Sequence, residues 1–200
     1  PRYLNEIVKN DPSFFAQLVK WLFKRRDGVT ENRDTESEEL RKQRAEAALE
    51  LLRSISVLPG STGATIDQDR LDIWIDQART LLGEAGRREI GDKQIGEYLA
   101  RCTEGTDGIW PHEAVRKVIE RVRSTDLESG VAISKFNSRG VVSRSPYEGG
   151  RQERELSARY KGNAQKLEFT YPRTAGILRE LADDYERLAQ DQDRSTELRE

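Results

Sequence analysis

The chain has 200 residues, of which 35% are charged and 35% hydrophobic, and its formal net charge is -2. This balance excludes a bulk electrostatic attraction to nucleic acid or membranes, and the single cysteine excludes an internal disulfide framework. One histidine and one cysteine are too few for a zinc site of His and Cys ligands, which takes three or four of them. The sequence therefore predicts no metal and no cofactor. A Ser-His-Asp or Cys-His catalytic centre would have to use His112, because it is the only histidine.

Composition also predicts the setting of the chain. No apolar run approaches the roughly 20 residues of a membrane span, and the lack of disulfides favours a cytoplasmic protein. The chain begins Pro1-Arg2-Tyr3, which is neither a signal peptide nor a natural translation start. We expect one helical domain over residues 1–200, or a subdivision into 1–58 and 66–200, as a fragment of a longer protein.

Helical periodicity dominates the first part of the chain. Residues 3–9 predict a short helix, and Asp11-Pro12 opens a second one as N-cap and first helical residue. Residues 25–36 lack an apolar period and predict a solvated loop. A helix is predicted next, from about Ser37 to Val57. Its buried face is marked by Leu40, Ala48, Leu51, Leu52 and Ile55.

The middle of the chain predicts four more helices. Pro59-Gly60 and a polar connector over 61–65 precede the first of them, which Asp67 caps. The second carries Ile95 and Tyr98 and is interrupted or delayed by Gly91. A turn at 103–108 leads to a helix that begins at Pro111. A short helix follows Ser124 or Thr125.

Residues 137–150 differ from the rest because they contain turn residues at both ends and a small β-like centre. They predict a long loop or a short irregular ribbon, and loops of this length are often functional. Two helices follow, around Leu156–Leu167 and from Pro172 onwards, with a charged tail from Gln190 that is expected to fray. The prediction is an all-α fold without a strand pair. It is an irregular multi-helix bundle or short α-solenoid of seven to nine helices with one long irregular loop.

Five segments spread over most of the chain are distinctive. They are Asp11-Pro12-Ser13-Phe14-Phe15, Asp92-Lys93-Gln94-Ile95-Gly96, Gly108-Ile109-Trp110-Pro111-His112-Glu113-Ala114-Val115, Asn137-Ser138-Arg139-Gly140-Val141 and Glu148-Gly149-Gly150-Arg151-Gln152-Glu153-Arg154-Glu155-Leu156. Together they resemble the C-terminal region of large, multidomain, poorly characterised bacterial proteins. The resemblance implies a bacterial origin. It implies no activity, and no functional residue is transferred from it.

Trp110-Pro111-His112-Glu113 is the most chemically suggestive cluster. His112 and Glu113 are candidates for an acid and a base at the rim of a pocket. The alternative is that Trp110 packs against the helix start and His112 is a surface or capping residue. The alternative is favoured because adjacent residues on a helix do not face one site.

The stretch 139–161 has a local excess of arginine and lysine. Backbone amides near Gly149 and Gly150, with Arg151 at a helix start, are candidates to hold a phosphate or another anion. The alternative is a charged, solvated helix face, and it is favoured. Two other clusters, Lys20 to Arg26 beside Trp21 and the acids Asp69, Asp72 and Asp76, are better explained by helix-dipole complementation than by nucleic acid or metal binding.

The leading functional prediction is a non-catalytic protein–protein interaction or scaffolding domain of a larger bacterial protein. In this prediction the 137–150 loop and an exposed apolar face contact another domain or another protein. Its contact residues are Trp110, His112, Arg139, Arg144, Tyr147, Gly149, Gly150 and Arg151, and none is assigned a catalytic role. One alternative is nucleic-acid or nucleotide/phosphate recognition through 139–161. A second is a hydrolase that uses His112 or clustered acids.

Overall fold

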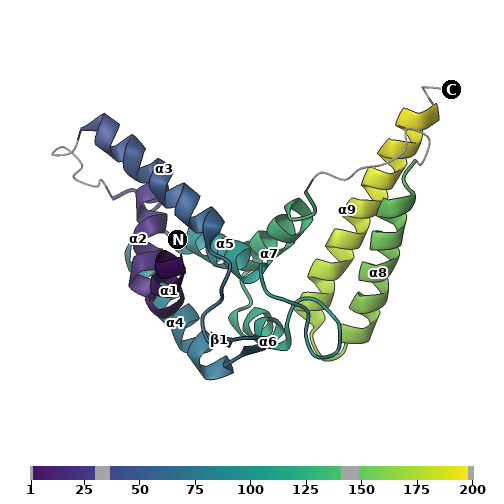
Figure 1. The fold of residues 1–200 in the computed structure, drawn as a ribbon, viewed down its shortest axis with the longest axis horizontal. Helices are drawn as coiled ribbons and strands as arrows, with labels where there is room; N and C mark the ends of the chain where they lie inside the picture. The colour runs from purple at the N-terminus through teal and green to yellow at the C-terminus, as the bar shows by residue number, and fades with distance from the viewer. Residues whose placement is uncertain (1, 30–36, 141–148, 198–200) are drawn as a thin grey trace.

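The computed structural model describes residues 2–29, 37–140 and 149–197. This described part contains nine helices and one two-stranded sheet (Figure 1). The elements are α1 (Arg2–Asn10), α2 (Pro12–Leu22), α3 (Glu38–Ser54), β1 (Ser61–Thr62), β2 (Thr65–Ile66), α4 (Gln68–Glu84), α5 (Arg88–Leu99), α6 (Glu113–Val122), α7 (Thr125–Asn137), α8 (Arg151–Leu167) and α9 (Pro172–Glu197). The predicted all-α class is confirmed.

The molecule has the outline of a V in Figure 1. One arm contains α1 to α5, the other consists of the antiparallel pair α8 and α9, and α6 and α7 lie between them. None of the helices in the described ranges is long and apolar enough to cross a membrane.

Helix starts follow from local side-chain chemistry. The Asp11 carboxylate accepts the amide of Ser13 at 2.8 Å, and Asp67 accepts the amide of Arg70 at 3.1 Å. Ser124 caps α7 in the same way. Each side chain satisfies an amide that the first helical turn leaves without a partner. The caps predicted at Asp11 and Asp67 are confirmed, as is a helix start after Ser124.

An aromatic cluster joins the N-terminal helices to α4 and α5. The rings of Phe15, Trp74 and Tyr98 pack against one another with centroids 5.1 to 5.9 Å apart. The indole N–H of Trp74 donates to the Val8 carbonyl at 3.0 Å, which fixes the position of α1. Because these rings come from α2, α4 and α5, residues before and after the 61–66 hairpin share one core.

The second arm is attached through α6 and α7. The Tyr185 ring of α9 contacts Phe136 of α7 at 5.1 Å and stacks on Tyr160 of α8 at 5.7 Å. At the start of α9, Glu120 of α6 accepts the backbone amides of Arg173 and Thr174 at 3.3 and 2.9 Å. A carboxylate from another helix therefore caps the N-terminus of α9.

Some predictions about individual elements were wrong. Leu40 is 46% exposed because α3 packs mainly against α2, through Ala48 and Leu52. The connector at 61–65 contains a small antiparallel pair, and Gly63 has the positive φ of 64° that suits its two-residue turn.

Gly91 does not delay α5, which begins at Arg88; Gly91 gives α5 room to pass Leu82 of α4. The last helix does not end near Gln190 but continues to Glu197, with Ala189 buried and Asp193 bonded to Gly150. Of the predicted 137–150 loop, Asn137 belongs to α7, and residues 141–148 lie outside the described residues, as do residues 30–36 of the predicted solvated loop.

Candidate functional site

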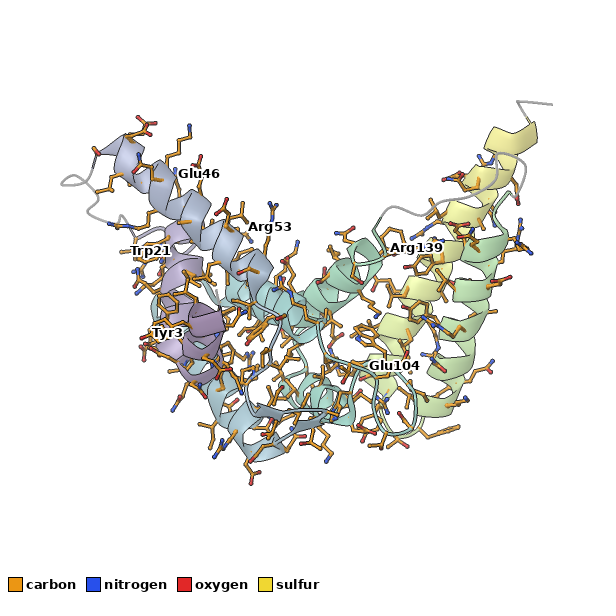
Figure 2. All side chains as sticks on the ribbon, viewed as in Figure 1. Tyr3, Trp21, Glu46, Arg53, Glu104 and Arg139 are labelled. Atoms are coloured by element: carbon orange, nitrogen blue, oxygen red, sulfur yellow. The ribbon has the colours of Figure 1, made fainter. Side chains whose placement is uncertain are left out.

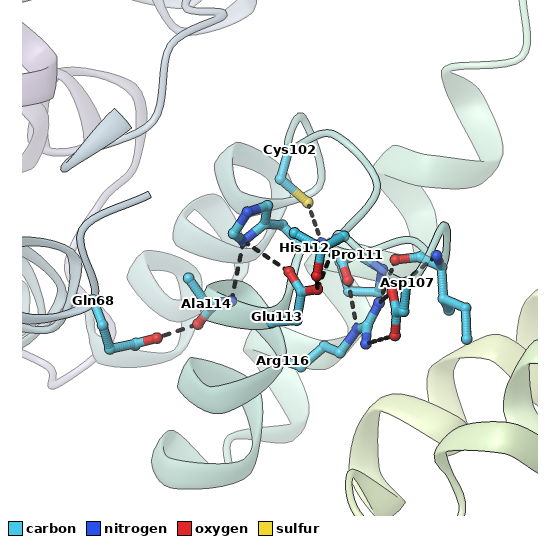
Figure 3. A network of polar contacts seen from close by, with 10 residues as sticks. Gln68, Cys102, Asp107, Pro111, His112, Glu113, Ala114 and Arg116 are labelled. Atoms are coloured by element: carbon cyan, nitrogen blue, oxygen red, sulfur yellow. Dashed lines mark hydrogen bonds and ion pairs between the residues drawn. The ribbon is translucent and has the colours of Figure 1, made fainter. Parts of the chain in front are cut away.

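His112 is the N-cap of α6 (Figure 3). Its Nδ1 accepts the amide of Ala114 at 3.2 Å, and its own backbone N–H donates to Cys102 Sγ at 3.4 Å. The capping interpretation fits this geometry, but His112 is buried and not on the surface. Because Nδ1 must be unprotonated to accept this bond, it is engaged in structure and not free as a base.

Glu113 and Cys102, which both contact His112, are also held in structural roles. Glu113 accepts the amide and the hydroxyl of Thr106 at 2.7 and 2.6 Å, and these bonds lower its pKa. Burial raises the pKa of the Cys102 thiol to about 11, so the thiol stays protonated at neutral pH and is a poor nucleophile. This geometry gives the hydrolase hypothesis no support from His112.

Arg116, which the sequence interpretation missed, holds the turn that precedes α6. Its side chain is 1% exposed and donates to both carboxylate oxygens of Asp107 at 2.6 and 2.8 Å. It also donates to the carbonyls of Ile109 and Pro111. The sequence signal was an arginine beside the apolar positions Val115 and Ile119 of this helix.

The predicted anion site at Gly149 and Gly150 is filled by the chain itself. The amide of Gly150 donates to Asp193 Oδ1 at 2.9 Å, and Arg154 pairs with the same carboxylate. Asp193 therefore provides, from α9, the anion that the start of α8 favours. Arg151 lies at this helix start and is exposed. Arg144 and Tyr147 lie outside the described residues.

Arg139 is neutralised within the fold. Its guanidinium lies 2.6 Å from the buried carboxylate of Glu153 and 5.5 Å from the centroid of the Tyr185 ring. Figure 2 shows it between α7 and the α8–α9 pair. The sequence placed Arg139 in a basic surface, whereas the structure makes it a link between α7, α8 and α9.

Lys135 lies one helical turn before Arg139. It connects the Trp110–Glu113 cluster with the basic stretch 139–161. Its Nζ lies 4.6 Å from the centroid of the Trp110 ring. Arg159 of α8 lies over the Tyr160 ring at 5.4 Å, and Tyr160 stacks on Tyr185. We call this set the cation–aromatic cluster. It consists of Lys135, Arg139, Arg159, Trp110, Tyr160 and Tyr185.

The charge of the cluster is not balanced. Lys135 is partly buried, and this desolvation, together with the nearby charge of Arg159, lowers its pKa. The negative charge of Glu104 raises the pKa of Lys135. Among the described residues, however, Glu104 makes no ion pair with Lys135 or Arg159. Within the described residues, neither Lys135 nor Arg159 has a carboxylate within 4.0 Å, which is the limit for a salt bridge.

The other charged clusters are paired internally. Arg121 lies 3.1 Å from Asp72 and 2.7 Å from Asp76, so these acids balance an arginine. No group of three His, Cys, Asp or Glu side chains in the described ranges is placed to hold a metal ion. In the cluster near Trp21, Arg25 pairs with Asp27 and Arg26 with Glu89.

Comparisons with protein-family models, with curated proteins and with solved structures find no match to this chain. The resemblance to bacterial C-terminal regions therefore stays a prediction, and the fold and the site define an all-α protein with an unbalanced cation–aromatic cluster.

Proposed function

We propose that this protein is a non-catalytic interaction module of a larger, cytoplasmic bacterial protein, and that its cation–aromatic cluster binds an acidic segment of a partner protein. One observation supports this most directly. Lys135 is a partly buried cation on the Trp110 ring, and it has no carboxylate partner among the described residues.

A desolvated ammonium without a counter-ion raises the free energy of the folded protein, and the Trp110 ring offsets only part of this. An aspartate or glutamate placed between Lys135 and Arg159 would balance both charges through charge-assisted hydrogen bonds. The indole N–H of Trp110 is also buried and lacks an acceptor among the described residues. The cluster is therefore polar and incompletely paired, and its two unpaired cations lie on α7 and α8, which favours recognition over turnover.

The partner favoured by these charges is a protein and not a nucleic acid. The formal net charge of -2 offers little attraction to a polyanion. Arg139 and Arg154 are already paired with Glu153 and Asp193. Two unpaired cations match one or two carboxylates, whereas nucleic-acid binding usually neutralises several phosphates.

The predicted exposed apolar face does not supply an alternative surface. The large apolar side chains that are exposed in the described residues are spread over several elements, among them Tyr3 of α1, Ile73 of α4 and Phe169 of the α8–α9 turn. Apolar residues scattered in this way form no contiguous patch on which a protein partner could dock.

The test is to select peptides from a random displayed library on the intact chain and to measure the binders by fluorescence anisotropy. We expect enrichment of aspartate and glutamate, and a loss of affinity of about ten- to a hundredfold in the double variant Lys135→Gln/Arg159→Gln. The matched control is Lys161→Gln/Lys166→Gln, which removes two exposed charges from the same arm and should bind normally.

Two outcomes would contradict the proposal: selected peptides without acidic residues, or equal affinity in the two double variants. A short single-stranded RNA is measured in parallel. Binding of this RNA that falls steeply with salt, in the absence of peptide binding, would favour the nucleic-acid alternative.

A further inference from the structure

A pocket on the other arm is lined by residues of α1, α2, β1, α4 and the segment before β1. It encloses about 280 Å³. That is near the lower end of the range of about 300–1,000 Å³ for small-molecule sites. We infer that this pocket binds a small organic carboxylate with an apolar body.

The lining of the pocket mixes polar and apolar groups. One apolar member is Trp74, whose ring packs against Phe15 and Tyr98 and whose N–H is held by the Val8 carbonyl. Pro12 and Pro59 form part of the wall, and proline restricts the backbone there. Ile73 lies at the rim and is 58% exposed, although it is a large apolar side chain. An apolar ligand body would cover it without any rearrangement of the pocket.

Two cationic side chains, Lys9 and Arg70, line the same pocket and have N–H donors that make no hydrogen bond within the described residues. The Lys9 side chain is only 18% exposed, and its one ion pair, to Glu6, is long at 3.8 Å. The ion pair of Arg70 with Asp67 is similarly long at 3.7 Å. Among the described residues neither side chain donates a hydrogen bond to a protein acceptor. A ligand carboxylate is the chemistry that both side chains recognise.

Neutral donors complete the lining. The side chains of Ser61, Thr62 and Gln77 face the pocket and donate no hydrogen bond in the part of the chain that the structure describes. Polar groups placed beside apolar ones are typical of sites that orient a small ligand. Phosphate alone would leave Trp74 and Ile73 uncovered, so the apolar body is part of the recognition.

The experiment is a titration of the intact, ¹⁵N-labelled chain followed by amide chemical shifts, with hexanoate, hexanol and inorganic phosphate as separate probes. We expect hexanoate to shift the amides of Lys9, Thr62 and Arg70 saturably, with a dissociation constant on the order of 1 mM. Hexanol and phosphate should each bind at least about tenfold more weakly, because each lacks one half of the recognised chemistry.

The double variant Lys9→Gln/Arg70→Gln should lose at least about tenfold in hexanoate affinity. Arg41→Gln/Lys42→Gln, which removes two exposed charges from α3, is the matched control and should bind like the parent. Well-dispersed spectra of both variants check that they are folded. Absence of saturable shifts, equal affinity for hexanoate and phosphate, or equal loss in both variants would each overturn the inference. None of these results depends on the cation–aromatic cluster.

Discussion

Arg116 is the residue on which the turn before α6 depends. Replacement by methionine keeps an unbranched apolar stem but leaves the Ile109 and Pro111 carbonyls without their donor. Each buried acceptor that loses its partner costs about 1–3 kcal/mol, so we expect Arg116→Met to lower the free energy of unfolding by about 3 kcal/mol. Urea denaturation at neutral pH measures this. A loss below about 1 kcal/mol would show that the turn is held by other contacts.

Asp107 should give the same contact a pH dependence. Hydrogen bonds from Arg116 lower its pKa in the folded protein to about 2. Since an unfolded aspartate has a pKa of about 3.9, the stabilisation is present above that value and is lost as the pH falls toward 2. The difference in unfolding free energy between wild type and Asp107→Asn should be larger at about pH 6 than at about pH 3. A difference independent of pH would contradict this.

At the level of elements, α5 and α7 meet through two glycines. A Cβ on Gly96 would overlap the Leu127 carbonyl, and one on Gly130 would overlap the Lys93 carbonyl. We expect Gly96→Ala and Gly130→Ala each to destabilise the fold by about 1–3 kcal/mol, because backbone atoms cannot yield as a flexible side chain can. Thermal or urea unfolding of each variant gives this value.

Gly162 and Gly176 are the controls for that prediction. Both lie in helices, α8 and α9, and neither would place a Cβ within 4 Å of another group. Alanine at either position should stabilise by about 0.5–1 kcal/mol through its helix propensity. If alanine also stabilised positions 96 and 130, the close approach of α5 and α7 would be wrong.

Most helices could be predicted from the sequence, but the tertiary contacts between them could not. Asp11, Asp67 and Ser124 mark helix starts because a cap acts on amides two or three residues away. The contacts of Lys135 with Trp110 and of Asp193 with Gly150 join distant segments, and no local pattern encodes them. The prediction therefore singled out Trp110 and the Gly149–Gly150 turn, but the only anion it considered at that turn was a ligand, and it did not foresee Asp193 there.

At the level of the whole molecule, the α8–α9 arm is joined to the rest through α6, α7 and Arg139. The contacts include the Phe136–Tyr185 ring contact, the Arg173–Glu128 and Arg139–Glu153 ion pairs and the Glu120 cap of α9. α8 itself packs mainly against α9. An arm attached in this way can open as a cooperative unit without disturbing the core around Trp74.

Glu120→Ala tests this because it removes the cap and leaves the interior of the arm unchanged. Loss of an N-cap costs about 1–2 kcal/mol, so amides in α8 and α9 should exchange about 5- to 30-fold faster while those in α4 and α5 are unaffected. Hydrogen exchange measured by mass spectrometry resolves the two arms. The control, Glu168→Ala, removes an exposed pair with Arg179 and should change exchange by no more than a fewfold. Equal acceleration in α4 and α5 would mean that the two arms unfold as one unit, and that the V is a single cooperative structure.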